Sequence, residues 1–181
     1  MPIRRLLLLS FFAAPLLLGG CATMNADECR QADWRFLGLR DGQRGEPLTK
    51  LDSRVQACAE HKVSANTQQY FEGRNQGLLE YCRLDQAARY GLEGKPYHGV
   101  CSPGIDGEFR RRHALGWEVN QARSALNSVV NRQRGLENEL SKAKNDDERQ
   151  KLRRQIRDLD WDVSRARERV RTAEWNLDRM R

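Results

Sequence analysis

The chain has 181 residues, of which 31% are charged and 39% hydrophobic, and it carries a formal net charge of +7. This composition is typical of one folded unit with a polar surface, and it excludes disorder throughout the chain. The charge is uneven, because residues 22–107 carry a net charge of −1 and residues 108–181 carry +6. We therefore expect two regions of different structure.

The first segment has the pattern of an export signal. Basic residues precede an apolar run that is interrupted by Pro15 and ends in Leu18-Gly19-Gly20-Cys21. A membrane-spanning helix needs about 20 apolar residues, so we expect residues 1–20 to be a cleaved signal peptide instead. The last four residues resemble the lipobox of bacterial lipoproteins, and this resemblance implies diacylglyceryl transfer to the Cys21 sulfur, cleavage after Gly20 and acylation of the new amino terminus. An ordinary signal peptide followed by an unrelated cysteine is the alternative.

Four further cysteines occupy the region after the signal: Cys29, Cys58, Cys82 and Cys101. An even number of cysteines in an oxidising compartment favours two disulfides, for which three pairings are possible. Zinc is the competing interpretation. Structural zinc sites use closely spaced ligand pairs, whereas these cysteines are far apart and the three histidines fall at no ligand-like spacing. We expect neither a metal nor a cofactor.

Residues 21–28 are expected to form a lipidated tether and residues 29–107 a helical domain rich in cysteine and glycine. Asp33 to Gly42 predicts a short helix with glycines at helical spacing, which would let another backbone approach closely. Glu46-Pro47 predicts the start of a second helix, since proline is tolerated at the first helical position. Its apolar stripe is expected in the core: Leu48, Leu51, Val55 and Cys58.

The second half of this domain also combines predicted helices with glycines at helical spacing. Asn66 with Gln69 predicts the start of a helix near Thr67 to Arg83, one face of which combines Tyr70, Gly73, Gly77 and Tyr81. Asp85 is expected to cap a shorter helix that stops at Gly91 to Gly94. An irregular segment follows, and Ser102-Pro103 predicts the start of the next helix.

The expected turns choose between the disulfide pairings. Two helices joined by a tight turn bring together residues that are equidistant from the turn. The midpoint between Cys29 and Cys58 falls in the Gly42–Gly45 turn, and the midpoint between Cys82 and Cys101 falls beside Gly91. We therefore predict the pairs Cys29–Cys58 and Cys82–Cys101.

Residues 108–181 show a heptad repeat, which predicts a basic antiparallel coiled-coil hairpin. Apolar positions alternate gaps of four and three from Leu115 to Ala143, fail over Lys144 to Lys151, and resume from Leu152 to Met180. A turn near residues 144–148 would place Ala143 beside Leu152 and, layer by layer, Leu115 beside Met180. Asp146 or Asp147 could cap the returning helix.

Three tryptophans share the outer heptad position of this repeat: Trp117, Trp161 and Trp175. Trp117 and Trp175 lie near the base of the hairpin, where packing against the N-terminal domain would explain them. Trp161 lies farther along, and tryptophan is enriched at interface hot spots, so Trp161 is the better candidate for contact with a partner.

The joint spacing of the glycines, aromatic residues and cysteines resembles the domain-of-unknown-function 2799 family of bacterial lipoproteins. The resemblance covers about Asp27 to Gly116 and implies an envelope lipoprotein without an assigned activity. It is carried by Asp33-Trp34, Gly38, Asp41-Gly42, Gly45, Cys58, Tyr70, Gly73, Gly77-Leu78, Tyr81-Cys82, Gly91, Gly94, Tyr97, Gly99, Cys101 and Phe109.

The sequence contains no Gly-x-Ser-x-Gly, His-Glu-x-x-His or phosphate-loop motif. Tyr97-His98, with Asp41 as an orienting carboxylate, is the one cluster that could serve acid–base chemistry. We therefore expect an all-α, non-enzymatic lipoprotein on the periplasmic face of the bacterial outer membrane. Ala22 after the acylated cysteine, in place of Asp, favours that membrane by resemblance to sorted lipoproteins.

The hairpin is expected to contact an envelope protein or peptidoglycan, and self-association is a further possibility. Export makes nucleic acid an improbable partner for the basic region. Two alternatives remain: a small envelope enzyme that uses His98 and Asp41, and a module that binds anionic lipid or peptidoglycan.

Overall fold

The computed structural model describes residues 24–180, which form seven α-helices and no strand. The expected signal peptide and Cys21 lie outside these residues. The helices are α1 (Ala26–Gln31), α2 (Trp34–Arg44), α3 (Thr49–Glu60), α4 (Thr67–Tyr81), α5 (Leu84–Leu92), α6 (Pro103–Lys142) and α7 (Asp146–Asp178). The predicted all-α class is confirmed. None of these helices has the length and apolar character that crossing a membrane requires.

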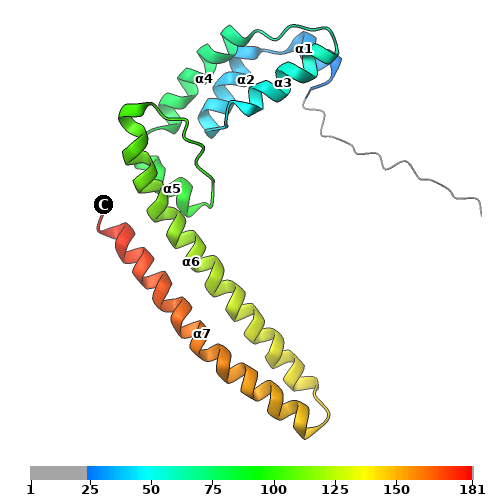
Figure 1. Ribbon diagram of the computed structural model, residues 1–181, viewed down its shortest axis with the longest axis vertical. Helices are drawn as coiled ribbons and strands as arrows, with labels where there is room; N and C mark the ends of the chain where they lie inside the picture. The colour runs from blue at the N-terminus through cyan, green and yellow to red at the C-terminus, as the bar shows by residue number, and fades with distance from the viewer. Residues whose placement is uncertain (1–23, 181) are drawn as a thin grey trace, which may run out of the picture.

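The molecule is elongated, with α1–α4 gathered at one end and α6 and α7 extending away from them (Figure 1). Helix α5 packs against the first part of α6, between these two regions. Because α6 is one helix of 40 residues, it runs without a break through the boundary expected at residues 107 and 108.

Side-chain caps start α2 and α4, and the one at Asn66 is the cap predicted from the sequence. The Asp33 side chain accepts a hydrogen bond from the Phe36 amide at the start of α2, and the Asn66 side chain accepts one from the Gln69 amide at the start of α4. The expected start at Glu46-Pro47 is wrong. The Glu46 amide donates to the Asp41 carbonyl and so closes the end of α2, and α3 begins only at Thr49.

This shift changes which residues of α3 are buried. Leu51 and Cys58 belong to the core and Val55 is half-buried, but Leu48 precedes the helix and is 49% exposed. Arg54 takes a buried place on the same face. The predicted apolar stripe is therefore correct except for Leu48, and the prediction did not include the buried charge of Arg54.

Glycines hold α2 and α4 in close backbone contact. A Cβ atom added at Gly38 or Gly42 would collide with the backbone of α4, and one added at Gly73 or Gly77 would collide with the backbone of α2. At these four positions there is therefore no room for a side chain between the two helices. The predicted role of these glycines in close packing is confirmed.

A second contact of the same kind joins α5 to α6. A Cβ atom at Gly91 would meet the His113 carbonyl oxygen, and one at Gly116 would meet the Ala88 carbonyl oxygen. The helix ends at Leu92, within the expected stop, and Gly94 supplies the left-handed geometry with a φ of 69°. Gly91 itself lies in the last turn of α5 and packs against α6. Two details differ: Arg83 is the residue before α5, and the Asp85 carboxylate pairs with Arg83 rather than capping the helix.

Both disulfides join the predicted partners. Cys29 of α1 pairs with Cys58 of α3, and Cys82 after α4 pairs with Cys101 before α6, with Cα atoms 5.5 Å and 5.6 Å apart. The first bond lies in a core with Trp34, Leu51 and Tyr70. The second lies in a core of aromatic residues: Tyr81, Tyr90, Tyr97 and Phe109.

Helix α7 returns along α6 in the opposite direction after a short turn (Figure 1). Val119, Ala173 and Leu177 are buried together where α6 and α7 meet, with Leu115 and Met180 packed against them. The Asn145 side chain accepts a hydrogen bond from the Glu148 amide and caps α7, in place of the Asp146 or Asp147 expected from sequence.

Candidate functional site

A buried ion pair lies between the N-terminal helices. Asp41 of α2 is 1% exposed, and both of its carboxylate oxygens accept hydrogen bonds from the guanidinium of Arg54 in α3. The Tyr70 hydroxyl of α4 donates to the same carboxylate at 2.8 Å. Three helices thus contribute one side chain each to a polar cluster within the core.

These contacts fix the protonation states of the cluster. Burial by itself would raise the pKa of Asp41, but hydrogen bonds from Arg54 and Tyr70 and the charges of Arg54 and Arg40 outweigh burial and lower that pKa. Burial and the neighbouring Asp41 carboxylate raise the pKa of Tyr70 to about 12. The cluster therefore holds an ionised Asp41 and a neutral Tyr70, which suits a structural role.

The acid–base pair expected from sequence does not form. Asp41 is enclosed by Arg54 and Tyr70 in the first half of the domain, whereas His98 lies exposed in the segment between α5 and α6. The segment that carries His98 packs in the other core, through Tyr97 and Val100. Asp41 therefore cannot orient His98, and this part of the enzyme alternative is wrong.

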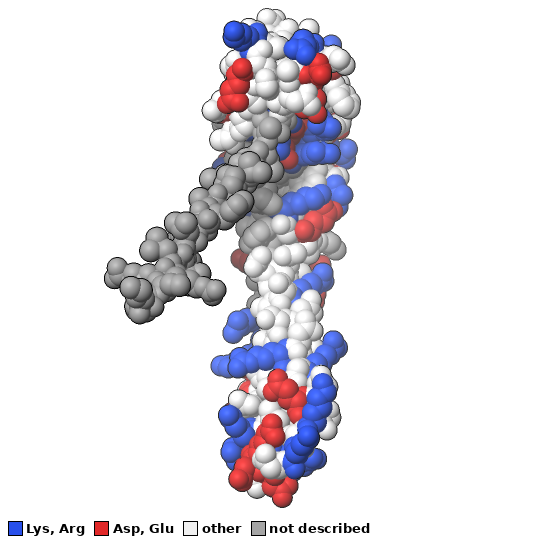
Figure 2. All heavy atoms as spheres, turned by 90° about the vertical axis from the view of Figure 1, so that its right-hand side faces the viewer, with Lys and Arg blue, Asp and Glu red and all other residues white. Residues whose placement is uncertain are grey.

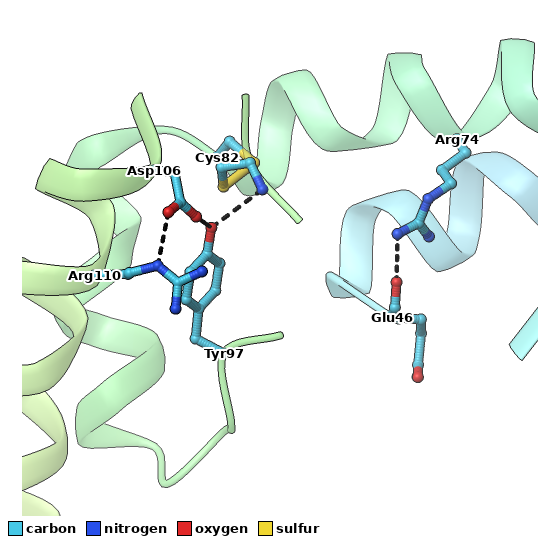
Figure 3. Close-up of a disulfide and its surroundings, with 7 residues drawn as sticks. Glu46, Arg74, Cys82, Tyr97, Asp106 and Arg110 are labelled. Atoms are coloured by element: carbon cyan, nitrogen blue, oxygen red, sulfur yellow. Dashed lines mark hydrogen bonds and ion pairs between the residues drawn. A yellow bond between two sulfur atoms is a disulfide. The ribbon is translucent and has the colours of Figure 1, made fainter. Parts of the chain in front are cut away.

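Tyr97 instead anchors the segment between α5 and α6, beside the second disulfide (Figure 3). Its hydroxyl donates to Oδ1 of Asp106 at 2.5 Å and accepts from the Cys101 amide at 3.1 Å. Arg110 donates from Nε to Oδ2 of Asp106 at 2.7 Å. Burial, followed by the hydrogen bond to Asp106, raises the pKa of Tyr97 to about 12. The hydroxyl therefore stays protonated as a hydrogen-bond donor.

His113 continues this arrangement one turn farther along α6. It is 8% exposed, and its Nε2 lies 2.7 Å from the Lys95 carbonyl oxygen. Its ring lies 5.9 Å from the Tyr97 ring and stacks on Trp117 at 6.0 Å. Tyr97, Asp106 and His113 all form hydrogen bonds that hold the segment to α6. Arg110 uses only its Nε in this arrangement, so its two Nη nitrogens can still donate to a ligand.

The three tryptophans have different surroundings. Trp117 is half-buried and stacks on His113 of the same helix. Trp175 is 58% exposed, with the guanidinium of Arg179 over its ring, 4.5 Å from the centroid, so its expected packing against the N-terminal domain is wrong. Trp161 is 75% exposed on α7.

Charges of both signs cover the lower part of the molecule. On the face shown in Figure 2, Lys and Arg side chains are interspersed with Asp and Glu side chains. Several of these form ion pairs on the surface, including Arg123 with Glu174 between the two helices. The net positive charge of this region is therefore spread among acidic groups, which is typical of a solvated helical surface.

Zinc has no thiolate ligands here, because the four cysteines outside the signal region are joined in disulfides. Within residues 24–180, no group of three or more His, Cys, Asp or Glu side chains could hold a metal ion.

The glycine contacts, the disulfides and the Tyr97 segment together occupy the part of the chain that resembled a known family. A family model described as "Protein of unknown function (DUF2799)" matches residues 33–118. This segment is a DUF2799 domain. No curated protein and no solved structure matches the chain.

The DUF2799 domain begins at the cap of α2 and ends on α6, two residues beyond the contact between Gly116 and α5. It includes both glycine contacts and the Cys82–Cys101 disulfide, whereas Cys29 of the other disulfide precedes it. Most of α6 and all of α7 lie beyond the match. Trp161 and Trp175 therefore lie outside the matched segment.

Sequence reasoning missed Arg54 and the Tyr97–Asp106–Arg110 contacts. Arg54 had a detectable signal, because it interrupts an apolar stripe and would be buried on any helix that buries Leu51 and Cys58. Asp106 and Arg110 had the spacing of an i, i+4 ion pair on a helix. The link to Tyr97 had no local signal, since it depends on how the segment folds back.

Proposed function

We propose that this protein is a lipoprotein of the bacterial outer membrane, anchored through Cys21 on the periplasmic face, that presents a coiled-coil hairpin to a partner in the envelope. In this proposal it binds and does not catalyse. The anchor rests on residues 1–21, whose pattern is that of a lipoprotein signal. The described chain begins three residues after Cys21, a span of at most about 11 Å, so the α1–α4 region would lie close to the bilayer.

The α6–α7 pair suits the role of an arm. Every apolar seam position predicted from Leu115 to Met180 is buried or half-buried, as a coiled-coil seam requires. Hydrogen bonds also cross between the helices, from Arg123 to Glu174 and from Gln133 to Asp160. With 40 residues, α6 is about 60 Å long, so its far end would stand well away from the membrane.

The exposure of Trp161 is the observation on which the partner proposal rests. A tryptophan ring that is 75% exposed on a helix leaves a large apolar area in water, and such rings are enriched at interface hot spots. Trp175 lies two heptads away on the same face of α7 and is also exposed. Arg165 pairs with Asp162 and Arg171 pairs with Glu168 along α7, and these interspersed acidic groups favour a protein partner over an anionic lipid surface.

Photo-crosslinking in intact cells tests this contact. A photoreactive amino acid at position 161, and in a second strain at position 175, should trap the same protein as one discrete adduct. The control position is Asn131, an exposed residue at the outer heptad position of α6, which faces away from α7 and should trap nothing. Recovery of monomer alone from positions 161 and 175 would refute the partner proposal, and an adduct of twice the chain mass would identify the partner as a second copy.

The anchor needs a separate measurement. Intact mass spectrometry of the membrane-extracted protein should give the chain from Cys21 onward, with added acyl groups. A chain that retains residues 1–20, or one without acyl groups, contradicts the anchor whatever the crosslinking result.

A further inference from the structure

A pocket lies between the segment that follows α5 and the first part of α6. Its volume is about 360 Å³, and it is lined by Pro96, Tyr97, Arg110, His113, Ala114 and Trp117. We propose that this pocket binds a small apolar carboxylate, with the ring or chain of the ligand against the aromatic side chains and the carboxylate on Arg110. The proposal is independent of the lipid anchor and of the partner contact at Trp161.

Aromatic rings form a continuous apolar wall. The Tyr97 and His113 ring centroids are 5.9 Å apart, and His113 stacks on Trp117 with ring planes 23° apart. Hydrogen bonds fix the first two rings, because the Tyr97 hydroxyl is held by Asp106 and His113 is held by the Lys95 carbonyl. The pocket is therefore already formed without a ligand, and small-molecule sites are typically concave and largely apolar in this way.

Arg110 places one cation at the edge of this wall. Its Nε is held by Asp106, and its guanidinium carbon lies 5.1 Å from the centroid of the Tyr97 ring (Figure 3). These two contacts orient the guanidinium in advance. No hydrogen bond to another residue in 24–180 engages its two Nη nitrogens. A guanidinium with two free parallel donors matches the two oxygens of a carboxylate.

Asp106 does not compete for the ligand position. One of its oxygens accepts from the Tyr97 hydroxyl and the other from Nε of Arg110, so both oxygens face donors of the protein. Its charge reduces the attraction of Arg110 for an anion, and Arg110 is itself 56% exposed. We therefore expect the carboxylate to add about tenfold to the affinity of an apolar group, not several orders of magnitude.

The experiment compares two probes that share a ring system: 2-naphthoate and the uncharged 2-naphthylmethanol. Each is titrated into the full chain carrying Cys21→Ser, which removes the acyl chains as competitors, and binding is followed by ¹H–¹⁵N correlation spectra. We expect saturable shifts that centre on residues 96–117, with 2-naphthoate binding about tenfold more tightly.

Three variants assign the contacts. Arg110→Gln should remove the preference for 2-naphthoate, and Ala114→Leu should weaken both probes at least about tenfold by filling the pocket from an exposed position that folding tolerates. Arg111→Gln is the matched control, because Arg111 is 71% exposed, pairs with Glu108 and does not line the pocket. It should leave both affinities unchanged.

Three results would overturn the assignment. They are the absence of saturable shifts at residues 96–117, a preference for 2-naphthoate that survives Arg110→Gln, and unchanged binding in Ala114→Leu. Preserved dispersion of the amide spectrum shows that each variant is folded.

Discussion

Replacing Gly73 by alanine should force α2 and α4 apart. An alanine Cβ at this position would lie 1.9 Å from the Arg35 carbonyl oxygen and 2.8 Å from the Leu39 amide nitrogen, both backbone atoms of α2. Ordinary contact begins near 3.4 Å, so relief requires a displacement of about 1.5 Å. Because the atoms that the Cβ would meet belong to the backbone of α2, no rotation of a side chain can provide this displacement.

The expected cost follows from two opposing effects. Alanine in place of glycine inside a helix is worth about 1 kcal/mol of stability. Overpacking usually costs about 1–3 kcal/mol when side chains can adjust, and we expect about 3–5 kcal/mol here, since two helices must separate. The net loss in the free energy of unfolding should be about 2–4 kcal/mol.

Urea unfolding with intact disulfides measures this loss, followed by tryptophan fluorescence, to which the buried Trp34 of α2 contributes. Gly135→Ala is the matched control, because a Cβ at that position of α6 meets nothing within 4 Å. It should stabilise the protein by about 0.5–1 kcal/mol. If Gly73→Ala were as stable as the unaltered chain, the close backbone contact between α2 and α4 would be refuted.

Three further changes test the polar clusters and the second disulfide. Asp41→Asn leaves the buried Arg54 without its counter-charge and should cost about 3–5 kcal/mol in the same urea assay. The pKa of Asp41 is lower in the folded chain than in the unfolded chain, so ionised Asp41 stabilises the folded chain above about pH 4. This stabilisation is lost as the pH falls further. Asp41→Asn should therefore make the free energy of unfolding less dependent on pH below about pH 4. Tyr97→Phe removes the hydroxyl that joins Asp106 to the Cys101 amide and should cost about 1–2 kcal/mol, while hydrogen exchange in α2 and α4 stays unchanged. Replacing Cys82 and Cys101 together by serine reopens a loop with a sequence separation of 19 and should cost about 3 kcal/mol by differential scanning calorimetry; an unchanged melting temperature would contradict it.

The cap at Asn66 could be predicted because its signal is local. Asp33 and Asn66 cap helices through amides only three residues away, so the sequence around each contains the whole interaction. The Cys29–Cys58 pair followed from the turn after α2, which lies near the midpoint between the two cysteines. The Cys82–Cys101 pair is also the predicted one, but the midpoint between these cysteines lies inside α5 and not in a turn. The expected start of α3 at Glu46-Pro47 is too early, because Glu46 belongs to the end of α2 and α3 begins at Thr49.

The polar clusters could not be predicted because each draws on separate helices. Asp41, Arg54 and Tyr70 come from α2, α3 and α4, and no spacing along the chain links them. The same is true of Tyr97, which reaches Asp106 only because the segment after α5 folds back over the start of α6. The sequence therefore offered His98 as the candidate, next to the residue that carries the interaction.

The tryptophans show how far a heptad repeat can be interpreted. Trp117, Trp161 and Trp175 share the position opposite the seam, and the repeat correctly turns all three away from the partner helix. The repeat does not predict whether a third element packs on the outer face. At Trp117, the segment that carries Tyr97 and helix α5 cover that part of α6. Trp161 and Trp175 have no such cover within the described chain. They are 14 residues apart and so about 21 Å apart along one face of α7. A partner that covers both rings must therefore be extended along the helix, which a second helix is and a small ligand is not.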